Sequence, residues 1–207
     1  MSVVLNATSA LLSVTSFTFY FIGVIGYSVR EEAVKNVNWF HVFQRNSVHV
    51  NAGLRALYYE DSTGTNAQAI YADCTQDFCD RCDKYGHSTF ALLVVALVLA
   101  FIVTLLSVSG AFAPSSSISG ANIALSVTSV IFGAVGFGLF THICFPKLEN
   151  EVNVDWDYGP GAIFTLIAFL LMFIVAVLQV VATALAPKAE AATASPVKSE
   201  AVSTNEL

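Results

Sequence analysis

Charged side chains are absent from three long stretches of this 207-residue chain, residues 1–29, 87–146 and 158–187. A charge near the centre of a bilayer costs ~2.5–3.5 kcal/mol even on the most lenient insertion scale. Such uniform exclusion predicts segments that cross a membrane. The composition agrees, because only 12% of the residues are charged, about half the ~25% of a soluble domain.

A membrane-spanning helix needs ~20 apolar residues. The stretch 87–146 is too long for one helix, and Pro114 followed by serines predicts a tight turn at residues 113–117. A cleaved signal peptide at the N-terminus is disfavoured, because no basic residue precedes an apolar run longer than the usual ~7–15 residues. We therefore expect an all-α membrane fold, a bundle of four transmembrane helices with a small β-containing extracellular loop domain. The expected regions are a membrane domain at 1–187, with spans 3–29, 88–112, 118–145 and 160–186 and outer loops 30–87 and 146–159, and a disordered cytosolic tail at 188–207.

Four spans place both termini on one side, which we expect to be the cytosolic side of the plasma membrane. The basic residues oppose this orientation, since seven lie in the expected outer loops and two in the inner segments. The cysteines favour it, because all four face one compartment and an extracellular compartment is oxidising. Free thiols facing the cytosol are the alternative. The candidate disulfide residues are Cys74, Cys79, Cys82 and Cys144, whose three possible connectivities the sequence does not distinguish.

A zinc site is a further alternative for the cysteines. Cys79, Cys82 and His87 have the spacing of three zinc-knuckle ligands. The fourth position falls on Leu92 within a span, so another cysteine would have to complete the site. We expect disulfides instead, with no bound metal and no cofactor.

The first outer loop is too long to be a mere connector. Its short β-type runs, separated by turn residues, predict a small antiparallel sheet. Trp39 and Phe40 have an alternative role as an aromatic anchor at the membrane interface. The expected strand runs are residues 39–43, 48–50, 57–59 and 69–72, and a turn is expected at 61–66.

The expected outer segments hold 12 acidic and 7 basic side chains. A net-negative face would raise the local cation concentration, although simple solvation of the loops explains the same residues. The spacing of a calcium-binding loop is absent from the sequence. The candidate outer-face acids are Asp73, Asp77, Asp80, Asp83, Glu149, Glu151, Asp155 and Asp157.

Small residues recur at helical spacing within the expected spans. They let helix backbones approach closely, which predicts packing within the bundle, with dimerisation through one face as the alternative. No ionisable side chain lies deep in a span and no catalytic motif occurs, so we expect neither a transporter nor an enzyme. With no basic patch, nucleic acid is not an expected partner. The candidate packing residues are Ser129, Gly133, Ala134, Gly136, Gly138, Ala96 and Ala100.

This organisation resembles the claudin-like tetraspan superfamily, which includes claudins, the peripheral myelin protein family, calcium-channel gamma subunits and amastins. Trp39, followed by Gly53-Leu54 and the later cysteines, is similar to the W…G-L-W…C…C loop pattern, and residues 158–164 resemble the Y-G-x-G-F run that opens the last span of amastins. Arg55 stands where the second Trp would be, and the cysteine spacing differs from the claudin pair. The resemblance implies a non-enzymatic surface protein in adhesion, barrier formation or membrane organisation. It alternatively implies an auxiliary subunit of a channel or transporter. Expected partners are the lipid bilayer and a second copy or another membrane protein.

Overall fold

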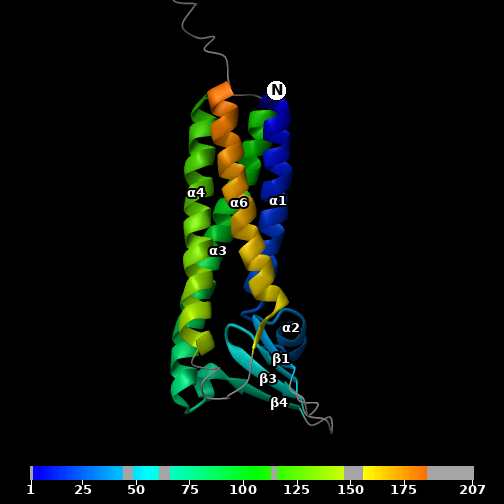
Figure 1. Ribbon diagram of the computed structural model, residues 1–207, viewed down its shortest axis with the longest axis vertical. Coiled ribbons are helices and arrows are strands. Elements are labelled where there is room, and N and C mark those ends of the chain that lie inside the picture. The colour runs from blue at the N-terminus through cyan, green and yellow to red at the C-terminus, as the bar shows by residue number, and fades with distance from the viewer. Residues whose placement is uncertain (1, 44–48, 61–65, 113–115, 147–155, 186–207) are drawn as a thin grey trace, which may run out of the picture.

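The computed structural model describes residues 2–43, 49–60, 66–112, 116–146 and 156–185. Four long helices form an elongated bundle, and a small sheet with a short helix lies at one end, here called the sheet end (Figure 1). All four helices are long and apolar enough to cross a membrane, so this is a multi-pass membrane protein by length and composition. The long helices are α1 (Ser2–Ile25), α3 (Asp77–Phe112), α4 (Ser116–Leu139) and α6 (Pro160–Leu185).

The helix α3 is much longer than the span expected at residues 88–112. Its 36 residues correspond to about 54 Å at 1.5 Å per residue, well beyond the ~30 Å of hydrocarbon. The first turns, which carry Cys79 and Cys82, extend past the bundle toward the sheet. These cysteines were expected in a loop, and that expectation is wrong. Charges in this stretch mark the end of the apolar span, but they do not interrupt the helix.

The helix α1 ends before the expected limit of its span. The expected span ran to residue 29, whereas α1 stops at Ile25. A Cβ at Gly26 would lie 2.7 Å from atoms of the Trp39 indole, so the space beside the helix end is already occupied. Near the sheet end of α4, a π-helical segment, η2 (Phe140–Cys144), continues the helix.

The expected antiparallel sheet is present, and it has five strands in the order β4-β3-β2-β1-β5. Its last strand comes from the second loop and was not expected from the sequence. A short helix, α2, and a 3-10 turn, η1, were also not expected. Of the turn expected at 113–117, residues 113–115 lie outside the described residues, and the expectation is wrong for the last two positions, because α4 begins at Ser116. Residues 61–65 of the turn expected at 61–66 lie outside the described residues, as does the tail. The elements are α2 (Glu31–Asn36), β1 (Phe40–Phe43), β2 (His49–Ala52), β3 (Ala56–Glu60), β4 (Asn66–Ile70), η1 (Tyr71–Asp73) and β5 (Asp157–Tyr158).

One hydrophobic core runs from the bundle into the sheet. In the bundle, α1 and α4 each pack against α3 and α6. At the sheet end, Phe40 of β1 stacks on Phe140 of η2 with ring centroids 5.6 Å apart. Both side chains are fully buried, so the sheet is packed onto the bundle as part of the same fold.

Candidate interaction surface

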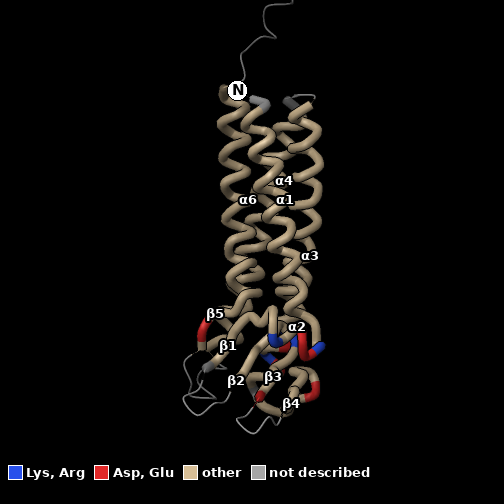
Figure 2. Tube along the Cα trace, turned by 90° about the vertical axis from the view of Figure 1, so that its right-hand side faces the viewer, with Lys and Arg blue, Asp and Glu red and all other residues tan. Residues whose placement is uncertain are grey.

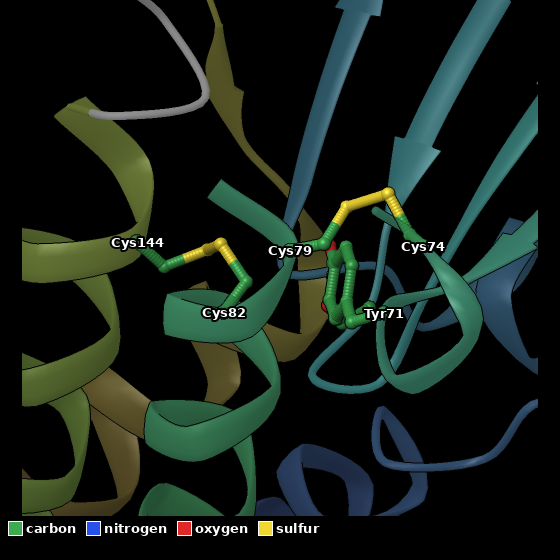
Figure 3. Close-up of a disulfide and its surroundings, with 6 residues drawn as sticks. Tyr71, Cys74, Cys79, Cys82 and Cys144 are labelled. Atoms are coloured by element: carbon green, nitrogen blue, oxygen red, sulfur yellow. Dashed lines mark hydrogen bonds between the residues drawn. A yellow bond between two sulfur atoms is a disulfide. The ribbon is translucent and has the colours of Figure 1, made fainter. Parts of the chain in front are cut away.

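Two disulfides fix the sheet end. Cys82 of α3 is bonded to Cys144 of η2, with Cα atoms 4.9 Å apart, and Cys74 is bonded to Cys79, with Cα atoms 5.8 Å apart (Figure 3). Both separations lie in the usual range for a disulfide. The first bond links two membrane-spanning helices, and the second links the end of the sheet segment to α3. With their sulfur atoms bonded to each other, these cysteines are not thiolate ligands for the zinc site considered above.

Tyr71 lies next to the Cys74–Cys79 bond (Figure 3). Its side chain is 1% exposed, and its hydroxyl donates to the Gly53 carbonyl at 3.3 Å. Burial raises the pKa of this hydroxyl, so the tyrosine stays a neutral donor. It therefore holds the β2–β3 connection against the disulfide-linked segment.

Two carbonyl groups at the C-terminal end of α1, that of Gly23 and that of Gly26 just beyond the helix, accept hydrogen bonds from the sheet segment. Carbonyls at a helix C-terminus have no partner within the helix. Here the Trp39 Nε1 donates to the Gly23 carbonyl at 3.2 Å, and the Leu54 backbone N–H donates to the Gly26 carbonyl at 2.9 Å. The end of the first span and the sheet segment thus complete each other's hydrogen bonding.

Trp39 is the central side chain of this junction. It is fully buried and packs edge-on against Phe140, with ring centroids 5.5 Å apart. Cβ atoms added at Gly26 or Gly161 would lie within 3 Å of its ring. The glycines therefore make room for the indole. The alternative of an aromatic anchor in the lipid interface is wrong for both Trp39 and Phe40, because protein atoms surround them.

A polar cluster joins the segment that follows α1 to α3 at the same level. The Tyr27 hydroxyl is hydrogen-bonded to His87 Nδ1 at 2.5 Å, and His87 Nε2 lies 3.5 Å from an Asp83 oxygen. The Tyr27 ring stacks on Phe90, while the Arg55 guanidinium lies 5.5 Å from the ring centre. The histidine of the alternative zinc site therefore hydrogen-bonds to the segment that follows α1.

A second polar network attaches α2 to β3. The Tyr58 hydroxyl donates to Glu31 at 2.8 Å, and Lys35 lies 3.1 Å from Glu31 and 3.0 Å from Glu60. Hydrogen bonds from Tyr58 and then Lys35 lower the pKa of Glu31. The Tyr58 side chain, followed by Glu60 and Glu31, raises the pKa of Lys35. This pair was not predicted from the sequence; the i,i+4 spacing of Glu31 and Lys35 is the signal that could have indicated it.

The charged side chains of the described residues lie at the sheet end (Figure 2). Asp73, Asp80 and Asp157 are exposed, and Asp83 is half-buried beside His87. The candidate acids therefore do not converge on one point, and no group of three or more potential metal ligands occurs among the described residues. Asp77 is the first residue of α3, with its side chain outside the description. The remaining candidates, Glu149, Glu151 and Asp155, lie outside the described residues.

Most of the candidate packing residues lie inside the bundle. The Ser129 hydroxyl donates to the Ala96 carbonyl at 3.0 Å, and the Thr89 hydroxyl donates to the Gly136 carbonyl at 3.0 Å. At Gly133, an added Cβ would collide with the Tyr20 hydroxyl. These residues hold helices together within one molecule. Ala96, Ala100, Ser129, Gly133 and Gly136 are buried, whereas Ala134 and Gly138 are half-buried.

The two edges of the sheet differ in character. The strand β5 is two residues long, carries exposed Asp157 and is followed by Gly159 and Pro160, all features that discourage further strand pairing. The strand β4 is five residues long, Asn-Ala-Gln-Ala-Ile, and its first four residues are exposed. Within the described residues it pairs with β3 alone. It therefore presents an open row of backbone donors and acceptors without a charge or a proline.

Gln68 holds this edge in place. Its amide donates to the Val29 carbonyl, between α1 and α2. The residues on either side of it, Ala67 and Ala69, lie opposite Tyr59 and Leu57 of β3. Because the edge strand is anchored at its centre, its free side has a defined position relative to the bundle. The strand expected at residues 69–72 covered only the end of β4, because Asn66 was expected in a turn and Tyr71 begins η1.

Comparison with protein-family models and with curated protein sequences finds no match to this chain.

Proposed function

We propose that this protein is a non-enzymatic, claudin-like tetraspan of the plasma membrane that acts in adhesion, barrier formation or membrane organisation by self-association. Its sheet would lie outside the cell and both termini in the cytosol. Two observations support this orientation and role. All four cysteines are paired at the sheet end, as suits an oxidising compartment, and the sheet is packed onto the bundle through Trp39 and Phe40.

The observation that carries the proposal is the open edge of β4. Natural sheets protect an exposed edge with lysines, prolines, bulges or short strands. The Asn66–Ile70 run has none of the first two, and its whole length pairs in regular register with β3. An edge strand of this kind accepts another strand through main-chain hydrogen bonds.

The geometry favours a second copy of the same strand. In Figure 1, β4 runs across the long axis of the bundle instead of along it. Two copies in one membrane, related by a two-fold axis along the membrane normal, keep their sheets at equal height. That axis, placed beside β4, brings two such strands together antiparallel. With Gln68 at the centre, Ala67 of one copy faces Ala69 of the other, and no like charges meet.

Cysteine crosslinking in native membranes tests this arrangement. Copies carrying Ala67→Cys and copies carrying Ala69→Cys are expressed together and oxidised mildly. We expect a covalent dimer, because directly opposed Cβ atoms in an antiparallel pair are about 4.5–5.5 Å apart. An Asp157→Cys variant on the opposite edge is the matched control and should stay monomeric. A dimer formed equally by the control would indicate random collision.

The same experiment separates self-association from the alternative role. A covalent band that contains a different membrane protein in fixed stoichiometry, with no dimer, would contradict self-association. It would support an auxiliary subunit that modulates a channel or transporter. A Gln68→Pro substitution in native membranes provides a second measurement, because proline removes a backbone donor. It should lower the yield of the dimer if β4 pairs as proposed, and an unchanged yield would also contradict the proposal.

A further inference from the structure

An open pocket of about 460 Å³ lies where α1 ends and α2 begins. Its apolar wall includes Val24 and Ile25 from the last turn of α1, together with Ala33 of α2. Its charged wall includes Arg30 and Glu32. Arg30 is the first charged residue of the chain, so the pocket extends from the apolar end of a membrane span to the beginning of the polar sheet segment. This is the level at which lipid headgroups meet the hydrocarbon.

Arg30 and Glu32 have opposite charges, and neither forms an ion pair within the described residues. The acid between them behaves differently, because Glu31 is bound to Tyr58 and Lys35. In the described part of the chain, Arg30 and Glu32 form hydrogen bonds through their backbones: the Arg30 N–H donates to the Ser28 hydroxyl, and the Glu32 carbonyl accepts from the Asn36 side chain. The pocket therefore offers one guanidinium and one carboxylate that are both available to a ligand.

We propose that this pocket binds the headgroup of a zwitterionic phospholipid from the leaflet at the sheet end. The Arg30 guanidinium binds the phosphate, for which its planar fork of donors is well matched. The Glu32 carboxylate binds the ammonium group, and the first acyl carbons lie along Val24 and Ile25. An anionic headgroup without an ammonium fits less well, because its negative charges would face Glu32. The binding of this lipid does not depend on the self-association proposed above.

Native mass spectrometry of the purified, delipidated protein in detergent tests the site with added phosphatidylcholine. We expect binding of the lipid, and a loss of affinity of about tenfold in Arg30→Gln, the scale of one charge-assisted hydrogen bond. Glu32→Gln should also weaken binding, but by less, because the carboxylate meets the choline ammonium as an ion pair without a hydrogen bond. Arg81→Gln is the matched control, since Arg81 is exposed on α3 and does not line the pocket. It should bind like the wild type. Equal thermal midpoints for the variants exclude misfolding, because both substituted side chains are exposed.

Three results would overturn the proposal. Equal affinity in all variants would show that the lipid binds elsewhere. Tighter binding of phosphatidylglycerol, strengthened further by Glu32→Gln, would indicate an anionic headgroup instead. Equal affinity for soluble glycerophosphocholine would mean that the acyl chains contribute nothing and that the natural ligand is a free zwitterion, not a membrane lipid.

Discussion

Substitution of Trp39 tests the junction between the first span and the sheet. In Trp39→Phe most of the aromatic packing remains, but the Nε1 donor that reaches the Gly23 carbonyl at 3.2 Å is lost. A buried acceptor left without a partner costs about 1–3 kcal/mol. Since 1.4 kcal/mol corresponds to a tenfold change in an equilibrium constant, local opening of the junction should become about 5–150 times more frequent. Trp39→Ala also leaves a cavity and should cost about 3–5 kcal/mol.

Hydrogen exchange measured by mass spectrometry on protein in lipid nanodiscs detects this opening locally. We expect faster exchange in β1, in β2 and in the last turn of α1, with little change in α3 and α4. The matched control is Trp156→Phe. Trp156 is also buried, but its Nε1 has no hydrogen-bond partner within the described residues, so loss of the donor costs less there. The reasoning is refuted if Trp39→Phe leaves the exchange of the sheet within twofold of the wild type, or if the two variants behave alike.

Other substitutions test the disulfides, the polar network and the bundle. Replacing Cys82 and Cys144 by alanine removes a link between positions 62 residues apart, and should lower the free energy of unfolding by at most about 4 kcal/mol, measured by thermal unfolding in detergent; a midpoint unchanged from the wild type would contradict this. The pKa of Glu31 is lowered from 4.5 by its partners, so its contribution to stability is present above pH 4.5 and is lost as the pH falls through the lower folded value. In Glu31→Gln the thermal midpoint should therefore fall less steeply with decreasing pH over this range. An unchanged pH dependence of the midpoint would assign it to other groups. Gly133→Ala should cost about 1–3 kcal/mol through overpacking against a tyrosine hydroxyl, whereas Gly138→Ala, where only an ordinary contact with His142 arises, should be neutral or stabilising in the same assay.

The spans and the sheet were predictable because each has a strong local signal. Exclusion of charge marks four helices, and β-type runs between turn residues mark the strands of the first loop. The start of α3 at Asp77 was not predictable from these signals, because charges at Asp80 and Asp83 look the same in a loop and in a solvated helix. The pairing of β5 with β1 was also hidden. The two residues of β5 are too few to show an alternating pattern, and Tyr158 is in a strand only because it pairs with Phe40, which is distant in the sequence.

The candidate site was likewise predictable only in part. Cysteine number predicted disulfides, but their connectivity depends on how α3 and η2 approach each other in space. The role of Trp39 likewise depends on Gly26 and Gly161, which lie far apart in the chain and meet only around the folded indole. Short sequence patterns do not record such long-range contacts, so the interface anchor was an equally reasonable interpretation of that tryptophan.

The most direct test of the account is thiol labelling of intact cells with a membrane-impermeant maleimide. In the proposed arrangement the protein has four spans and its disulfide-linked sheet faces the exterior. We therefore expect no labelling of untreated cells, and labelling of the cysteines at the sheet end after treatment with an impermeant reductant. Labelling without reduction would show that the thiols are free, and labelling that appears only in permeabilised cells would place the sheet in the cytosol.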